Sequence, residues 1–357
     1  MEVAAAKSES EIVRPRGLSL SWAVAAVGFL VVSLLVGIAA GPVDLGIGEI
    51  LQSLGERLHV PGVTSSLTPI EDTVLWDLRV PRVVLGALVG GMLALAGATY
   101  QGVFRNPLAD PYLLGVAAGA GLGATLAIAY LPERLSGQQA LPPAAFVGGL
   151  VAVVLAYAVG RSAGRERDAA TLVLAGVTVA SFFTAAQTFV QQRNTDTLQQ
   201  VWSWILGGLP TSGWTDVALI LPYVLIGGGV IVAHRRVLDV MSVGDDEAES
   251  LGVNVRRVRL LLVVAATVGT AAAVSVAGLI AFVGIIVPHA IRLVTGATYR
   301  ALLPLSFICG AGFLVLADVV ARTALAPAEI PIGIVTAFIG APFFALVLRT
   351  TRGGSIG

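Results

Sequence analysis

The sequence predicts an all-helical integral membrane protein with about ten transmembrane helices. Of its 357 residues, 56% are hydrophobic and only 12% are charged, which is about half the charged fraction of a soluble domain. Several apolar runs approach twenty residues, the length at which a helix crosses the hydrocarbon core of a bilayer. We expect the spans at about residues 20–40, 81–104, 111–131, 142–160, 171–191, 216–233, 258–277, 279–295, 301–321 and 331–349.

The distribution of positive charge predicts the orientation of these spans. If both termini face the cytoplasm, sixteen of the 22 lysines and arginines fall in inner segments and six in outer ones, the asymmetry described by the positive-inside rule. One membrane domain over 20–350 then lies between two cytoplasmic tails, at 1–19 and 351–357. It includes an outer loop at 41–80 that contains an amphipathic helix. It also includes an interfacial helix with two tryptophans at 198–207 and a cytoplasmic loop at 235–257.

Composition excludes several function classes. The only lysine, Lys7, lies near the N-terminus, whereas a nucleotide-binding P-loop needs a lysine directly after its glycines. Three scattered histidines and one cysteine offer no metal-ligand cluster, so we expect no metal and no cofactor bound by this chain. The spacing of the residues gives no catalytic group of nucleophile, base and orienting residue. A net charge of zero gives no excess of positive charge with which to bind nucleic acid.

The stretch over residues 79–114, RVPRVVLGALVGGMLALAGATYQGVFRNPLADPYLL, carries the most information. Its apolar run contains a GxxxG pair, Gly86 and Gly90, which allows a neighbouring helix to approach closely. A polar turn with two prolines follows, and it suits a tight break between helices.

This stretch resembles the FecCD family of ABC importer permeases. Two distant stretches strengthen the resemblance, GLIAFVGIIVPHAIR at 278–292 and LADVVARTALAPAEIPIGIVTAFIGAP at 316–342, so that it covers roughly residues 20–350. The resemblance implies the type II ABC importer permease fold in the bacterial cytoplasmic membrane. It also implies three kinds of partner: two ATPase subunits that bind ATP and Mg, an extracytoplasmic substrate-binding protein, and a second permease copy that is either identical or a paralogue.

Three arginines at the expected outer ends of spans, Arg79, Arg82 and Arg322, match family motif positions that pair with glutamates of the binding protein. Planar guanidinium groups suit carboxylate recognition. The alternative interpretation is interfacial anchoring of the helices by long basic side chains. Asp318, four residues before Arg322, is placed to pair with it on one helix face.

The cytoplasmic loop predicts a short helix. Asp245, Asp246 and Glu247 suit the positive end of a helix dipole, and Gly252 suits a C-terminal stop. In the family the matching loop forms the coupling helices that enter a groove on the ATPase subunit. The resemblance therefore implies that the contact residues are Glu249, Ser250, Leu251 and Gly252. The alternative is an ordinary capped surface helix.

The resemblance also implies two cytoplasmic gates. Asn106 and Leu108, in the turn after the second span, match one gate loop, with a rigid connector as the alternative. Ala169 and Ala170 match a second gate at which some family members have hydroxyl residues, so a polar gate is not expected there.

Thr184 and Gln187 lie on the fifth span, where polar side chains face protein or water rather than lipid. They either line the pathway or bond to a neighbouring helix, and the sequence does not separate these two interpretations.

We expect a permease that moves a ferric siderophore from the binding protein into the cytoplasm, with cobalamin and haem as alternative cargoes. A secondary transporter that needs no ATPase is a further alternative. No acidic residue lies at the middle of any predicted span, and this disfavours coupling to protons or sodium.

Overall fold

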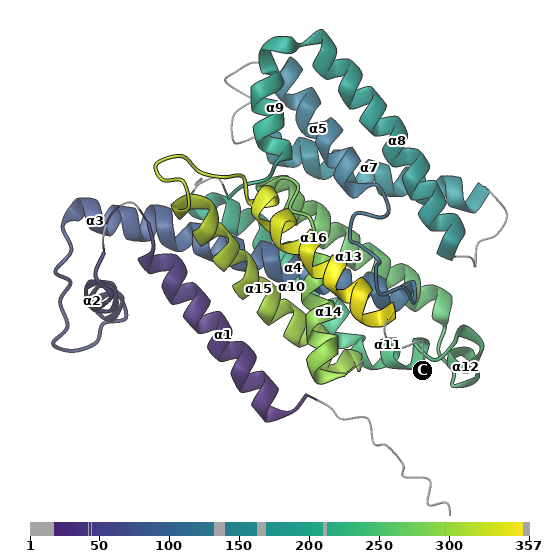
Figure 1. Cartoon of the computed structure of the whole chain (residues 1–357), viewed down its shortest axis with the longest axis horizontal. Coiled ribbons are helices and arrows are strands. Elements are labelled where there is room, and N and C mark those ends of the chain that lie inside the picture. Colours follow the sequence, from purple (N-terminus) through teal and green to yellow (C-terminus); the bar gives the residue numbers. More distant parts are fainter. Residues whose placement is uncertain are drawn as a thin grey trace, which may run out of the picture.

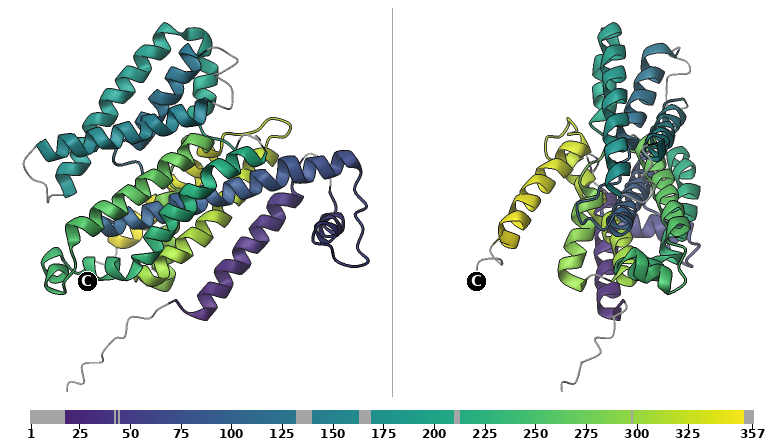
Figure 2. Two further views of the ribbon diagram at one scale, coloured as in Figure 1. Left: turned by 180° about the vertical axis from the view of Figure 1, so that it is seen from behind. Right: turned by 90° about the vertical axis from the view of Figure 1, so that its right-hand side faces the viewer.

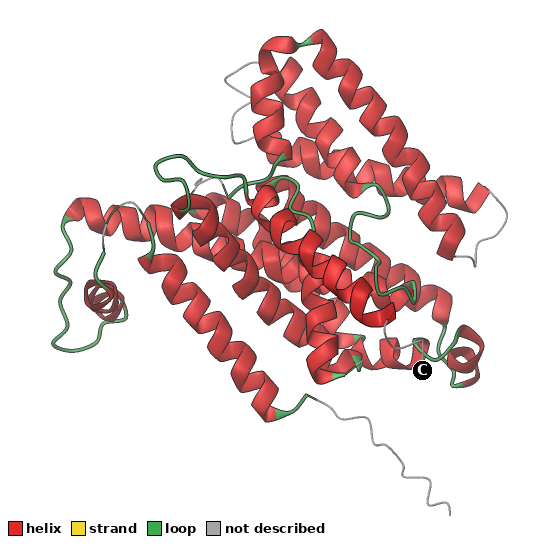
Figure 3. Cartoon of the chain, viewed as in Figure 1, coloured by secondary structure: helices red, strands yellow, loops and turns green. Residues whose placement is uncertain are grey.

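The protein is described by a computed structural model that covers residues 18–41, 43, 45–131, 140–162, 169–209, 213–296 and 298–352. All regular structure within these residues is helical (Figure 3). The predicted tails at 1–19 and 351–357 lie almost entirely outside the described residues.

The described part of the chain has an apolar helix at each of the ten predicted spans. Seven are long and apolar enough to cross a membrane: α1 (Leu20–Ala39), a continuous helix over Pro69–Val103, α7 (Leu141–Ser162), α8 (Ala169–Arg193), α10 (Trp214–Ala233), α13 (Val255–Ala277) and α15 (Tyr299–Thr323). Three further apolar stretches are shorter: α5 (Val116–Tyr130), α14 (Val283–Thr295) and the part Ile332–Val347 of α16 (Ile332–Arg352).

The helix that contains the second span begins at Pro69, before the predicted span start at residue 81, so its first part lies in the expected outer loop. It comprises α3 (Pro69–Thr73), the wider π-turn η1 (Val74–Arg79) and α4 (Val80–Val103). Thr68 caps its start, because its hydroxyl accepts the backbone N–H of Glu71 at 3.3 Å and the Glu71 carboxylate accepts the backbone N–H of Thr68 at 2.8 Å. This capping box satisfies N–H groups that have no partner within the helix.

The eighth span is shorter than predicted. Gly278 and Phe282 both have positive φ, at 67° and 71°, so the chain cannot be helical there and α14 starts at Val283. A helix of this length is too short to cross a bilayer alone.

The centre of the structure is α4, which packs against α10, α13, α14 and α15 (Figure 1). Glycines make these contacts close. A Cβ added to Gly90 would lie 2.3 Å from the carbonyl oxygen of Gly310, and one added to Gly97 would lie 1.9 Å from that of Gly284. No side chain fits at either place, so the predicted close approach at the GxxxG pair is confirmed for Gly90.

A second group of helices consists of α5, α7 and α8, with the short α9 (Leu198–Ile205) beside them (Figures 1 and 2). Gly119 and Gly148 let α5 and α7 approach to the same degree, because a Cβ added to either would lie 2.2 Å from the other's carbonyl oxygen. The predicted interfacial helix at 198–207 is α9.

The bundle has two ends, which we name after the short helices that mark them. The α12 end carries α11 (Arg235–Met241), α12 (Asp245–Ser250) and the start of α1 (Figures 1 and 2). The α2 end carries α2 (Ile47–Arg57), α3 and the loop 324–331 that joins α15 to α16. The predicted amphipathic helix of the outer loop is α2.

Candidate functional sites

Arg82, in the first turn of α4, binds two carboxylates at the α2 end. Its Nη1 and Nη2 donate to the two oxygens of Glu329, both at 2.9 Å, in a parallel fork. Its Nε and Nη2 also donate to Asp318 on α15, at 3.1 and 2.8 Å. The side chain of Asp318 is buried, and it also lies 3.3 Å from Nε of Arg322. The predicted pair of Asp318 and Arg322 is therefore confirmed, within a network of four charged groups.

Arg79 and Arg322 hold the end of α1. Arg79 donates to the carbonyl oxygens of Ile38 and Ala39 at 3.2 and 3.1 Å, and Arg322 donates to that of Gly37. The last four carbonyl groups of a helix have no partner within it and attract positive charge. Because α1 has no basic residue in its own last turn, arginines from two other helices take that role.

The three predicted docking arginines therefore lie close together, but they do not form an exposed positive patch. All three are largely buried and bound within the chain, and the exposed charged group beside them is Glu329, whose side chain is 54% accessible. The hydrogen bonds from Arg82 hold the pKa of Glu329 below its ordinary value. Glu329 is not among the residues predicted for this site, although it lies inside the APAEIP part of the motif at 316–342.

The turn after α4 has a well-defined geometry. α4 ends in a Schellman motif, in which the backbone N–H groups of Arg105 and Asn106 donate to the carbonyl oxygens of Gly102 and Gln101 at 3.3 and 3.1 Å. The side-chain oxygen of Asn106 then accepts the backbone N–H of Leu108 at 2.9 Å. Asn106 and Leu108 are both exposed, so this turn presents its two predicted gate residues on the surface.

The second predicted gate lies at the first turn of α8. Ala170 is exposed there, and the side chain of Ala169 lies outside the described part of the chain. Neither position has a polar side chain, in keeping with the expected departure from a hydroxyl-lined gate.

The predicted short helix of the cytoplasmic loop is α12. Its acidic first turn and its stop at Gly252 are confirmed, since Gly252 has a φ of 83° and completes a second Schellman motif by donating to the carbonyl oxygen of Glu249 at 2.9 Å. Glu249, Ser250, Leu251 and Gly252 are all exposed. The apolar Leu251 is 73% accessible.

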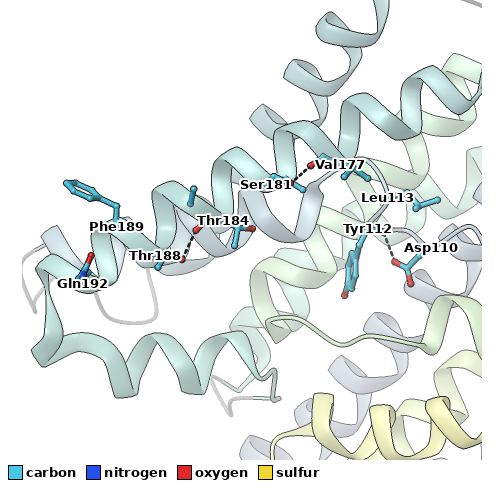
Figure 4. A pocket seen from close by; sticks show the side chains of 11 residues that line it. Asp110, Tyr112, Leu113, Val177, Ser181, Thr184, Thr188, Phe189 and Gln192 are labelled. Carbon is cyan, nitrogen blue, oxygen red and sulfur yellow. Dashed lines mark hydrogen bonds between the residues drawn. The ribbon is translucent and has the colours of Figure 1, made fainter.

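A broad groove of about 1000 Å³ runs along α8 (Figure 4). Its polar lining includes Ser181, Thr184, Thr188 and Gln192, which follow one face of the helix. The hydroxyl groups of Ser181 and Thr188 donate to backbone carbonyl oxygens four residues earlier, both at 2.9 Å. These polar groups lie among apolar side chains, such as Val177 and Phe189, and the groove is open to the surroundings.

The structure separates the two residues predicted to line a pathway. Thr184 lies in the groove. Gln187 is buried and faces α5, where a Cβ added to Gly121 would lie 2.9 Å from its side-chain oxygen. Thr184 therefore faces the open groove, whereas Gln187 faces a neighbouring helix.

Asp110 lies at one end of the groove, in the connection between α4 and α5, and its carboxylate accepts the backbone N–H of Tyr112 at 2.7 Å (Figure 4). Burial raises its pKa to about 6, although the bond from Tyr112 opposes the shift. A raised carboxyl pKa makes the folded state less stable as the pH rises from about 4 to about 6, because the buried group must then ionise.

We expect Asp110→Asn, which can keep the bond to Tyr112, to remove this penalty. At pH 7.5 the variant should be more stable than the unmodified protein by up to about 3 kcal/mol, and at pH 4 the difference should nearly vanish. Thermal unfolding in detergent across this pH range checks the prediction. An equal advantage at both pH values would contradict it.

Comparison with known proteins places these sites in a family. The chain is 40% identical to the cobalamin import system permease protein BtuC of Halobacterium salinarum, over 93% of this chain and 96% of that protein. It is 39% identical to the ABC transporter permease protein YvrB of Bacillus subtilis, over 91% and 93% of the two chains. It is also 38% identical to the hemin transport system permease protein HmuU of Yersinia pestis, over 90% and 95%.

A solved structure agrees with the fold. A metal-chelate type ABC transporter in an inward-facing conformation matches with a TM-score of 0.79 and 28% identity, over 92% of this chain and 98% of that chain. The FecCD transport family matches residues 29–350. The chain therefore belongs to the FecCD transport family and is a membrane permease subunit of a type II ABC importer, not an enzyme.

Proposed function

We propose that this permease moves a ferric siderophore from an extracytoplasmic binding protein into the cytoplasm. The observation that carries the proposal is the groove along α8, which is large, open and mainly apolar, with hydroxyl and amide groups along one face of the helix and Asp110 at one end. Such a surface suits a bulky chelate that carries its own metal ligands. Among the relatives, one is an iron(3+)-hydroxamate permease of Bacillus subtilis, with 34% identity over 97% of this chain.

Cobalamin is the second candidate cargo, because the cobalamin import permease of Halobacterium salinarum is 40% identical to this chain. Haem is a third, on the ground of the hemin transport permease of Yersinia pestis. All three cargoes are bulky metal chelates, and the groove alone does not distinguish them.

The α12 end faces the cytoplasm in this proposal, with the membrane being the bacterial cytoplasmic membrane. Five arginines gather on α11 and at the start of α13: Arg235, Arg236, Arg256, Arg257 and Arg259. Such a concentration is typical of the cytoplasmic side. Two ATPase subunits, which bind ATP and Mg, dock at α12 of this chain and of a second permease copy, identical or paralogous. The gates at Asn106 and Leu108 and at Ala169 and Ala170 close the cytoplasmic side of the pathway, of which Thr184 forms part.

The binding protein docks at the α2 end, on the surface built by Arg79, Arg82 and Arg322. Arg82 makes the main contact with the binding protein. Its Nη1 and Nη2 groups, which we call the outer fork, already bind one carboxylate, that of the exposed Glu329. A glutamate of the binding protein takes the place of Glu329, while Asp318 stays paired with Arg82. Arg79 and Arg322 hold the end of α1 beside this site.

Glu329→Ala is expected to tighten the binding of the binding protein about tenfold, because it removes a competitor for the outer fork of Arg82. Asp77→Ala, at the same end of the molecule, removes the same charge from a residue that is not among the partners of Arg82. It therefore controls for the change in surface potential. Binding of the purified binding protein to the permease in nanodiscs measures the effect. Unchanged or weaker binding by Glu329→Ala would contradict the exchange of carboxylates.

The cargo is tested by purifying the tagged chain from its host in mild detergent and identifying its partners by mass spectrometry. The recovered binding protein is then titrated with a ferric siderophore, cobalamin and haem. Tightest binding of the ferric siderophore supports the proposal. Tightest binding of cobalamin or haem replaces the cargo and leaves the type of transporter unchanged.

A further inference from the structure

We propose that Arg105 is a positioning residue that transmits movement of α12 to the turn of Asn106 and Leu108, through an ion pair with Asp245. The inference rests on the proposed function, in which α12 contacts the ATPase and the turn closes the pathway. It adds the physical connection between those two parts.

The first observation is the contact itself. Nη2 of Arg105 donates to Oδ1 of Asp245 at 2.7 Å. Asp245 is the first residue of α12, and Arg105 directly precedes Asn106. This ion pair joins α12 to the turn of Asn106 and Leu108, which we call the gate turn. The two paired residues are 140 positions apart in the sequence.

The second observation is that α12 is also fixed to the long helix α13. Nη2 of Arg259 lies 2.9 Å from both carboxylate oxygens of Asp245. Asp245 therefore binds Arg259 of α13 and Arg105 at the same time, and its Oδ1 accepts a hydrogen bond from both. Because α12 and α13 are joined in this way, a displacement of α12 reaches the gate turn through Asp245.

The third observation is the backbone of Arg105. It occupies the left-handed position of the Schellman motif, with a φ of 49°. Glycine is the usual residue there, because a side chain costs about 1 kcal/mol or more in this conformation. The equivalent position at the end of α12 is indeed a glycine, Gly252. Arginine at the end of α4 is locally unfavourable, and its side-chain contact with Asp245 gives a reason for its presence.

The fourth observation concerns the other gate. Between α12 and the start of α8 lies a cavity of about 400 Å³, lined by Asp246 and Glu249 of α12 and by Leu172 of α8, among others. Here α12 has open space on the side of the second gate, whereas it has a direct ion pair to the first. The structure therefore assigns the direct transmission to the turn of Asn106 and Leu108.

Arg105→Gly separates this role from a structural one, because glycine suits the backbone of the turn while the ion pair is lost. In proteoliposomes with the ATPase and the binding protein, we expect the variant to retain ATP hydrolysis within about twofold. The number of cargo molecules imported per ATP should fall about tenfold. Arg105→Lys keeps a positive charge within reach of Asp245 and should restore most of that ratio.

Arg300→Ala is the matched control. Arg300 pairs with Asp239 at 3.3 Å, also at the α12 end, and its side chain is 42% accessible, against 43% for Arg105. That pair joins α11 to α15 and does not involve the gate turn, so the ratio should not change. A normal ratio in Arg105→Gly, or loss of the ATPase from the complex, would overturn the proposed transmission. Absence of ATP-driven uptake in the unmodified complex would instead refute the proposed function.

Discussion

Arg82→Ala is expected to destabilise the folded protein by about 3 kcal/mol or more. The substitution leaves Asp318 buried with only Arg322 as a charged partner and releases Glu329. Removal of one member of a buried ion pair costs about 3–5 kcal/mol, because the remaining charge stays out of water without compensation. Unfolding of the purified protein by titration with a denaturing detergent measures the change in free energy.

Arg57→Ala provides the comparison for this first prediction. Arg57 and Asp72 form a pair at 3.0 Å at the same end of the molecule, but their side chains are 51% and 40% accessible. Exposed pairs contribute at most about 1 kcal/mol. Equal losses of unfolding free energy in the two variants would contradict the prediction, because they would show that burial does not increase the contribution of the Arg82 ion pairs.

Leu251→Asp is expected to abolish stable association with the ATPase, with affinity lowered at least about a hundredfold. Leu251 is exposed at the end of α12, so the change does not open a cavity in the core. A buried apolar residue at the centre of an interface contributes about 2 kcal/mol or more, and a charge in its place also has to be desolvated. Co-purification and a binding titration with the isolated ATPase check the result.

Ile70→Asp controls for the introduced charge, since Ile70 is equally exposed, at 77%, but lies on α3 at the opposite end. It should leave ATPase binding unchanged. Normal ATPase binding by Leu251→Asp would place the contact elsewhere than on the end of α12.

The helices and their ends were largely predictable, because the signals that set them are local. The acidic first turn and Gly252 define α12 in the sequence as well as in the structure. One local signal was missed: the capping box of Thr68 and Glu71 starts the helix of the second span well before residue 81. The short α14 likewise follows from the backbone at Gly278 and Phe282, and only the glycine is apparent in the sequence.

The sequence did not show that the site arginines are buried and paired within the chain, because their partners are distant in the sequence. Arg82 binds Asp318 and Glu329, which lie 236 and 247 residues further along the chain. Arg79 caps a helix that ends forty residues before it. Arginines near the ends of spans have the same local appearance whether they are open to a partner or bound within the chain.

The ion pair between α12 and the gate turn could not be predicted for the same reason, because its two residues are distant in the sequence. Arg105 and Asp245 each have an ordinary local explanation, as a positive charge beside a membrane span and as an acid at a helix start. Only the packing of α4, α12 and α13 brings them within hydrogen-bonding distance.

We expect this chain to import its cargo only together with an ATPase and a binding protein. Uptake is measured in proteoliposomes that contain the purified permease and ATPase, with loaded binding protein outside and ATP inside. Uptake should stop when ATP or the binding protein is left out, or when the P-loop lysine of the ATPase is replaced. Uptake by the permease alone, driven by a proton or sodium gradient and unaffected by ATP, would contradict it.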